Sequence, residues 1–373
     1  MLTLLEVPAL NGLQITWFAL VVVLWLGFFF LESFDFGVAM LLPILGRDSD
    51  AQKTDQNKRV MVNTIGPVWD GNEVWLLTAG GATFAAFPGW YATLFSALYL
   101  PLLLVLVGLI IRGVSFEYRS KNPETKWRNA FDWMATIGSL LASLVLGVGF
   151  ANFVKGIPVG ENMLFDKTQL WTGDAFLGQL FGMFTPFTLI GGVLFVAFCL
   201  FHGSTFLALK TKGEIHDRAK GFATTCGIAT AVLALVFVVW QNIGYGDNPF
   251  LGDMAWLGWV GILAPVLFAV GVVAVRAERD GWAFLATGGA IVFLILGIFI
   301  SMYGTIGFTQ AGAEVPSLNM ATASSSDNTL LLMTIVAGIF TPIVLAYQAW
   351  SYWVFSKRIS HKNLPVEAVE TAA

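Results

Sequence analysis

The chain has 373 residues, of which 57% are hydrophobic and only 12% are charged, and its mean hydropathy is +0.74. Since about a quarter of the residues in a soluble domain are charged, this composition indicates an integral membrane protein without a large soluble domain. The net charge of −4 excludes a basic nucleic-acid-binding surface as the main function. With three His and two Cys, dense metal or haem ligation by this chain is not expected.

Nine apolar segments are each long enough to cross a bilayer, because about 20 helical residues span a hydrocarbon core of about 30 Å. Lipid tolerates no exposed irregular backbone, so helix is the structure expected for all of them. The sequence therefore predicts an all-α integral membrane protein with nine transmembrane helices. The predicted spans are Ile15–Leu45, Val60–Phe87, Trp90–Ile111, Phe131–Phe153, Phe176–Leu209, Phe222–Ile243, Met254–Val275, Trp282–Tyr303 and Leu330–Phe355.

Basic residues are distributed unequally between the predicted loops. All but two of the 20 Lys and Arg follow spans one, three, five and seven or lie in the C-terminal tail; the exceptions are Lys155 and Lys167. Because Lys and Arg concentrate in cytoplasmic loops, we expect the N-terminus outside and the C-terminus in the cytoplasm. That arrangement requires an odd number of spans, which agrees with nine.

The whole chain, residues 1–373, is expected to form a single membrane domain. Spans one and five are both long, carry polar residues near the predicted cytoplasmic end and run into basic loops. This weak repetition predicts two four-helix bundles, residues 15–153 and 176–303. A peripheral ninth helix, residues 330–355, and a cytoplasmic tail, residues 356–373, would follow.

The second span contains two acids, Asp70 and Glu73, one helical turn apart on one face. Each charged side chain at the centre of a bilayer costs about 2.5 to 3.5 kcal/mol even on the helix-insertion scale, which gives the smaller of the known values. Counted from Val60, Asp70 should lie roughly 15 Å deep, where two carboxylates cannot both ionise cheaply. A proton-exchanging carboxyl is the functional interpretation. The alternatives are a structural hydrogen bond or an ion pair between Asp70 and Arg112, and Glu73 could equally face a partner chain.

Two more acids, Glu32 and Asp35, lie one turn apart in the predicted cytoplasmic half of the first span. With other polar residues on that side they could line an inlet leading toward Asp70. The alternative is a solvated, salt-bridged cluster at helix ends. The other residues of this predicted inlet are Arg112, Glu117, Arg119, Ser120 and Lys121, and the residues interpreted as packing support are Trp69, Asn72 and Trp75.

Histidine is too scarce for a chain that binds several haems. His216 and His361 fall in a predicted loop and in the tail, which leaves only His202 inside a span. A haem with two His ligands cannot be built there, and His202 is better interpreted as a hydrogen-bonded packing residue. The sequence contains no phosphate-binding loop, zinc spacing or catalytic-serine motif, so no metal site is predicted.

Three motifs together allow a comparison with a known family. They are Phe34-Asp-Phe-Gly-Val38; Pro67-Val-Trp-Asp-Gly-Asn72, which continues through Glu73-Val-Trp75 to Thr78-Ala-Gly-Gly81; and Phe116-Glu-Tyr-Arg-Ser-Lys121, followed by Trp127-Arg-Asn129 and Asp132-Trp133. The chain resembles subunit II of the cytochrome bd-type quinol oxidases over its whole length. In the second half of the chain, the resemblance lies in the arrangement of the spans more than in short motifs.

The resemblance implies a heterodimer in which subunit I holds two b-type haems, one d-type haem and the quinol-oxidising loop, while subunit II holds no haem. It implies that subunit II supplies a proton route from the cytoplasm to the oxygen-reducing haem, with Asp70 as the relay and Glu117 and Lys121 at the entrance. It also implies that subunit II can hold a quinone as a structural component. Glu32 and Glu73 depart from the pattern of many relatives, which have Asp-Gly-Phe-Asp around the first site and Gln at the second.

The expected function is therefore that of the haem-free subunit of a quinol oxidase in a bacterial inner membrane, reducing O2 to water and generating membrane potential without pumping. A proton-coupled secondary transporter is the alternative, since intramembrane acids and repeats also occur there. A purely structural scaffold is a third interpretation. The sequence leaves open the choice of quinol, a small third subunit, the site of any quinone, the helices that face subunit I, and whether the complex belongs to the cyanide-insensitive branch.

Overall fold

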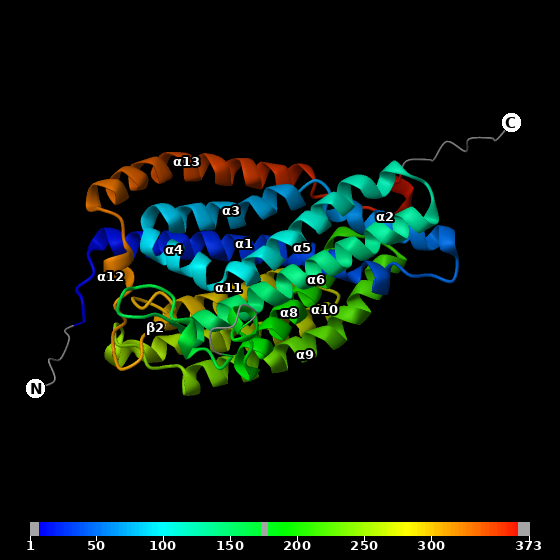
Figure 1. Cartoon of the computed structure of the whole chain (residues 1–373). Coiled ribbons are helices and arrows are strands. Elements are labelled where there is room, and N and C mark those ends of the chain that lie inside the picture. The colour runs from blue at the N-terminus through cyan, green and yellow to red at the C-terminus, as the bar shows by residue number, and fades with distance from the viewer. Residues whose placement is uncertain (1–6, 173–177, 365–373) are drawn as a thin grey trace, which may run out of the picture.

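A computed structural model describes residues 7–172 and 178–364, which form a bundle of long helices (Figure 1). The α-helices are α1 (Gly12–Leu45), α2 (Ala51–Ile65), α3 (Trp69–Ala86), α4 (Pro88–Ala97), α5 (Tyr99–Tyr118), α6 (Thr125–Lys155), α7 (Gly178–Phe181), α8 (Pro186–Lys210), α9 (Glu214–Gly244), α10 (Leu263–Arg276), α11 (Asp280–Ser301), α12 (Met320–Ala323) and α13 (Asp327–Val354). The 3-10 helices are η1 (Arg119–Lys121), η2 (Lys167–Gln169), η3 (Gly252–Ile262) and η4 (His361–Asn363). A short parallel pair joins β1 (Ile157–Pro158) to β2 (Phe308–Thr309).

Eight helical segments in the described ranges are long and apolar enough to cross a membrane. They are α1, α5 with η1, α6, α8, α9, η3 with α10, α11 and α13. Each corresponds to a predicted span, and α3, which carries the acids Asp70 and Glu73, corresponds to the remaining one. The chain is therefore a multi-pass membrane protein, whereas the count of nine and the orientation stay predictions.

The second predicted span, Val60–Phe87, is wrong as a single helix. It is interrupted at residues 66–68, between α2 and α3. Pro67 has no N–H to continue the helical hydrogen bonds, and its ring excludes the carbonyl of the preceding turn. Asp70 consequently lies in the first turn of α3, so a depth counted along a helix from Val60 is also wrong.

Other span boundaries also differ from the prediction, and at two of them a proline accounts for the difference. The segment Trp90–Ile111 is divided at Leu98, between α4 and α5, because the ring of Pro101 interrupts the helical hydrogen-bond pattern. The fifth span, Phe176–Leu209, begins too early: Phe176 lies outside the described residues, and α8 begins at Pro186. Proline suits that first helical position, where its missing N–H leaves nothing unsatisfied.

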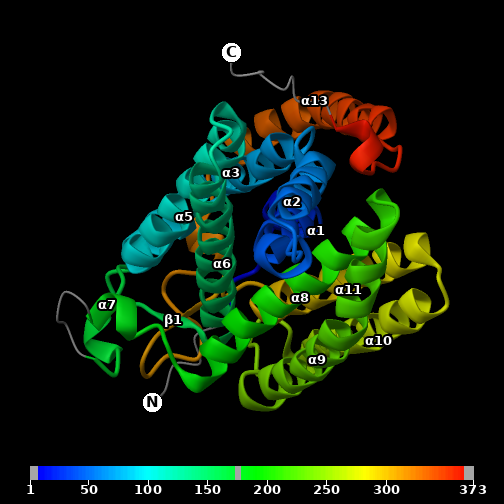
Figure 2. The same ribbon diagram turned by 90° about the vertical axis from the view of Figure 1, so that its right-hand side faces the viewer.

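The core depends on close approaches between helices. Where α1 crosses α8, Gly37 and Gly203 face each other, and a Cβ added to Gly203 would lie 2.7 Å from Cα of Gly37. Only glycine allows the two backbones to come so close, as small residues do between transmembrane helices. In Figure 2, α8, α9, α10 and α11 lie together beside α1, whereas α13 lies at the outer edge next to α3. The division into two four-helix bundles stays a prediction.

Candidate functional site

Arg112 lies at the centre of a buried group of charges contributed by three helices. Its side chain is fully buried in α5 and forms ion pairs with Glu32 of α1 and with Glu73 of α3. The Nη2 atom of Arg112 lies 2.7 Å from Oε2 of Glu73, whose side chain is 24% exposed, whereas Glu32 is fully buried. Burying an ion costs several kcal/mol unless opposite charges compensate, so the two acids stabilise this cation.

This placement of Arg112 differs from the sequence analysis, which put it in the loop after the third span. The apolar run ends at Ile111, but α5 continues for two further turns to Tyr118 because the charge of Arg112 is compensated inside the protein. The suggested ion pair between Arg112 and Asp70 does not form; Glu32 and Glu73 are its partners instead.

Aromatic rings complete the surroundings of Arg112. Its guanidinium carbon lies 4.7 Å from the ring centre of Phe36, 5.8 Å from that of Phe116 and 5.9 Å from a ring centre of Trp69. Ring faces attract a cation, and the attraction is larger where water is excluded. Trp69 thus lies against the guanidinium, and its supporting role stays a prediction. Trp75 packs on α1, where a Cβ at Gly27 would overlap its ring.

A chain of hydrogen bonds lies next to this charge group. The side-chain amide of Asn72 donates to Oδ2 of Asp35 at 2.6 Å, and both residues are fully buried. Oδ1 of Asn72 accepts hydrogen bonds from the Tyr352 hydroxyl at 2.7 Å and from Gln348 at 3.2 Å, both on α13. One amide therefore links α1, α3 and α13. Sequence reasoning missed the two α13 residues, although Gln348 stands out as a polar residue in a long apolar run.

The two acids of α1 retain unused hydrogen-bonding capacity. Within the described part of the chain, Oε2 of Glu32 and Oδ1 of Asp35 have no hydrogen-bond partner. Buried polar atoms are usually satisfied, and buried carboxyl groups of this kind cluster at functional sites. Glu32 and Asp35 could therefore accept a proton or bind an intervening water.

Five residues of the predicted site do not join the buried group; four of them are exposed, and the fifth, Arg119, belongs to the second ion cluster described next. Asp70 is exposed in the first turn of α3, Glu117 is exposed in the last turn of α5, and Ser120 and Lys121 are exposed in η1. Apart from Arg119, the predicted site residues thus separate into a buried set around Arg112 and an exposed set. The exposed set is open to water or to a partner chain.

A second ion cluster connects α2, η1 and the start of α6. Nε of Arg119 donates to Oδ1 of Asp132 at 2.5 Å, and Lys58 lies 3.0 Å from the other oxygen of Asp132. Asp55 pairs with Arg119 at 2.9 Å and with Arg128 at 2.5 Å. The guanidinium of Arg119, which the sequence analysis assigned to the inlet, is therefore engaged by Asp55 and Asp132. Sequence reasoning missed this cluster because its members are distant in sequence, although Asp132 belongs to one of the recognised motifs.

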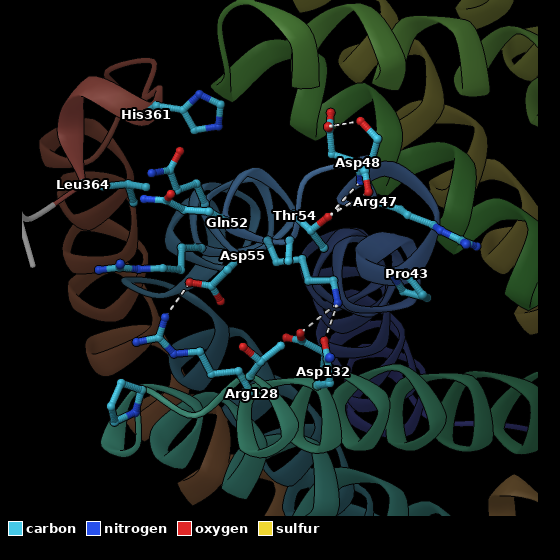
Figure 3. A pocket seen from close by; sticks show the side chains of 18 of the residues that line it. Pro43, Arg47, Asp48, Gln52, Thr54, Asp55, Arg128, Asp132, His361 and Leu364 are labelled. Atoms are coloured by element: carbon cyan, nitrogen blue, oxygen red, sulfur yellow. Dashed lines mark hydrogen bonds and ion pairs between the residues drawn. The ribbon is translucent and has the colours of Figure 1, made fainter.

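A polar cavity of about 1080 Å³ opens beside this second cluster, and we call it the α2 pocket (Figure 3). The loop after α1, the helix α2, the start of α6 and η4 line it; Asp55, Lys58, Arg128 and Asp132 contribute charged walls. At the rim, the backbone N–H of Asp50 and the guanidinium of Arg218 donate hydrogen bonds to Asp48. These bonds hold the pKa of Asp48 below its ordinary value, so its carboxylate is charged at neutral pH.

His202 lies inside a predicted span, and the contacts of its ring decide whether it could bind a haem. Its Nδ1 lies 2.7 Å from the Thr287 hydroxyl, its Nε2 lies 3.2 Å from the carbonyl oxygen of Phe30, and its ring stacks on Phe284 at 4.5 Å. Both nitrogens are engaged, so His202 does not fit a haem ligand. Over residues 7–172 and 178–364, no group of three or more His, Cys, Asp or Glu is arranged to hold a metal ion.

Comparison with known proteins decides the family. The family model described as cytochrome bd terminal oxidase subunit II matches residues 13–355. The chain belongs to this family. Among curated relatives, the cytochrome bd ubiquinol oxidase subunit 2 of Bacillus subtilis (strain 168) is 38% identical over 347 residues, covering 93% of this chain and 97% of the relative. The cytochrome bd-I ubiquinol oxidase subunit 2 of Escherichia coli (strain K12) is 37% identical over 382 residues, covering 94% and 96%.

The fold of this subunit II chain also matches a solved structure. The structure of the bd oxidase from Geobacillus thermodenitrificans aligns with a TM-score of 0.69 at 20% sequence identity, covering 93% of this chain and 100% of that chain. At this identity the likeness shows the fold alone.

Family membership has three consequences for this subunit II chain. The predicted resemblance is confirmed, and the chain is a subunit of a terminal oxidase complex that contains another subunit. The predicted location in a bacterial inner membrane is confirmed together with the multi-pass fold. An independent secondary transporter is set aside, and the chemistry of the subunit has to be argued from its residues.

Proposed function

We propose that this chain is the haem-free subunit of a quinol:oxygen oxidoreductase, and that it supplies protons from the cytoplasm for the reduction of O2 to water in a partner subunit I. The observation that carries the proposal is the buried group formed by Glu32, Arg112, Glu73, Asp35 and Asn72 on three helices. Charged groups inside a membrane protein are costly and commonly mark ion or proton paths.

The haems are proposed to lie in subunit I, where two b-type haems and one d-type haem would transfer electrons and reduce oxygen. The engaged nitrogens of His202 support this division of work. A quinone held in subunit II as a structural component and a small third subunit are both compatible with the proposal.

The proposed proton path uses both sets of site residues. Glu117 and Lys121, exposed at the end of α5 and in η1, form the entrance together with Ser120. Asp70 is the main relay, because its exposed carboxyl on α3 can pass a proton to a partner that covers this face. The buried acids and Asn72 form the supporting polar path, in which Arg112 keeps its charge and orients Glu32 and Glu73.

Charge movement follows from the location of the two half-reactions. Water formation requires one proton for each electron, and uncharged quinol releases its protons on the outer side of the membrane. If the protons for water come from the cytoplasm through this chain, each turnover separates charge across the membrane without a pump. This requires the orientation that the basic loops predict, with the N-terminus outside and the C-terminus in the cytoplasm.

An optical spectrum of the gently purified protein tests the assignment. We expect b-type and d-type haem bands only when a second chain copurifies with this one. When the two chains are separated, this chain should show no haem bands. A colourless protein that is complete without a partner would contradict the proposed function. Haem bands that stay with this chain alone would contradict its haem-free role.

A further inference from the structure

We propose that a second proton inlet runs through this chain, from the α2 pocket along one face of α6 to Glu32, by way of Asp132, Thr136 and Ser139. This inlet rests on the proposed function, since it delivers protons to the same buried acids. It differs from the entrance at Glu117 and Lys121, which lies on the exposed side of α5 and in η1. The substrate of the inlet is the proton, carried by water and hydroxyl groups.

The three polar residues of α6 follow helical spacing. Asp132, Thr136 and Ser139 are separated by four and three residues, so their side chains lie on one face of the helix. All three are buried, with 3%, 9% and 0% of their surfaces exposed. A buried polar stripe in a membrane helix needs a reason, because such side chains are costly in lipid and in an apolar core.

The stripe faces α1, where the acids of the site lie. The Thr136 hydroxyl donates to the carbonyl of Ala39 on α1 at 3.0 Å and to the carbonyl of Asp132 at 2.9 Å. The helices α1 and α6 run in opposite directions, since α1 ends beside α2 and α6 begins there (Figure 1). Moving from Thr136 to Ser139 along α6 therefore moves from Ala39 toward Asp35 and Glu32 along α1.

Ser139 follows the residue at which α6 packs on the backbone of Arg112. The preceding residue, Gly138, packs so closely on α5 that an added Cβ would lie 3.1 Å from the backbone nitrogen of Arg112. The Ser139 hydroxyl is fully buried and has no hydrogen-bond partner among the described residues. Oε2 of Glu32 is likewise buried and has no hydrogen-bond partner among the described residues. A buried hydroxyl with a free hydrogen and free lone pairs, on the helix that packs against α1, is suited to pass a proton toward an acid of α1 that has a free oxygen.

The opposite end of the stripe opens on the α2 pocket. Asp132 lines this cavity of about 1080 Å³ (Figure 3). Its carboxylate is held by Lys58 at 3.0 Å and by Arg119. Asp132 is 3% exposed, so it forms the inner wall of the pocket, and water in the pocket lies next to its ion pairs. Neighbouring side chains on a helix face are about 5–6 Å apart, a gap that one bridging water closes with two hydrogen bonds.

The test uses the complete oxidase in proteoliposomes, with proton uptake from the α2 side and oxygen reduction measured at saturating quinol. The variants are Ser139→Ala and the nearly isosteric Thr136→Val, each in the natural background and with Glu117→Gln. Ser143→Ala is the matched control, since Ser143 is buried on the same face of α6 but its hydroxyl already has partners, the carbonyl of Leu140 at 3.2 Å and Sδ of Met40 at 3.9 Å. We expect Ser139→Ala to slow uptake by about tenfold when Glu117→Gln closes the other entrance.

A deuterium isotope effect separates a relay from a packing role. Ser139→Ala should raise the solvent isotope effect on turnover, Ser139→Thr should restore it, and Ser143→Ala should not change it. Unchanged uptake in Ser139→Ala and Thr136→Val in both backgrounds, with uptake still slowed by Asp70→Asn, would overturn the second inlet and leave the proposed function standing. Unchanged uptake in Asp70→Asn and Glu32→Gln as well would overturn the proposed function itself.

Discussion

Asn72 donates a hydrogen bond of 2.6 Å to Asp35, and the same amide accepts one of 2.7 Å from Tyr352. This arrangement joins α1 to α13 through a single residue of α3. Leu330 is the buried residue of α13, and the rest of the helix is exposed or half-buried in this chain. The polar contact is therefore a specific link between the site and the outermost helix.

Removing the Tyr352 hydroxyl should weaken this link. In Tyr352→Phe, Oδ1 of Asn72 keeps only the bond from Gln348, and the complex should lose about 0.5–1.5 kcal/mol of stability. Thermal unfolding of the purified complex and hydrogen exchange along α13 measure the loss. Tyr347→Phe is the control, because Tyr347 is exposed on the same helix. Equal stability of the two variants would show that the Asn72 contact does not hold α13.

Removing the buried cation should be far more damaging. Arg112→Met leaves Glu32 and Glu73 without their shared counter-charge, so we expect a loss of about 3–5 kcal/mol and poor assembly. The double variant Arg112→Met with Glu32→Gln should recover part of this loss, because it removes the fully buried charge. Arg276→Met at the exposed end of α10 serves as the control. A stable single variant would contradict the compensating role of the acids.

His202 provides a test of the haem-free role. His202→Gln should retain every haem band of the complex, because both ring nitrogens already bind Thr287 and Phe30. The variant should still unfold at a lower temperature, since the stacking on Phe284 is lost. Loss of a haem band from an otherwise intact complex would mean that His202 is a ligand.

The crossing of α1 and α8 should tolerate no side chain. An added Cβ at Gly37 would overlap the backbone of Cys199, so Gly37→Ala should cost about 1–3 kcal/mol through overpacking. Gly221→Ala on α9 is the matched control, because nothing lies within 4 Å of its added Cβ. Chemical or thermal unfolding of both variants gives the comparison, and equal stability would contradict the close approach.

The long apolar runs made most spans predictable, because lipid leaves helix as the only structure for them. The breaks were harder: Pro67 was visible, but the apolar residues on both sides suggested continuity. Arg112 was assigned to a loop for the same reason, since hydropathy cannot show that Glu32 and Glu73 will compensate a charge inside α5. Such partners come from distant parts of the chain and are fixed only by tertiary packing.

The sequence indicated some residues of the candidate site but not their arrangement. Residue type and helical spacing singled out the acids of α1 and α3. Trp69 lies against Arg112 and Asn72 against Asp35, while their supporting roles stay predictions. The exposure of Glu117 and Lys121 and the contact between Asn72 and Tyr352 depend on how α5 and α13 pack. No local pattern in the sequence encodes that packing.

The most direct test of the proton path is the membrane potential formed per O2 reduced by the fully haem-loaded complex carrying Asp70→Asn in proteoliposomes. Asparagine keeps the size of the side chain but cannot exchange a proton at neutral pH. We predict that charge separation and oxygen consumption fall together by about tenfold or more, with an unchanged haem spectrum. Oxygen consumption and membrane potential equal to those of the natural protein would contradict the account.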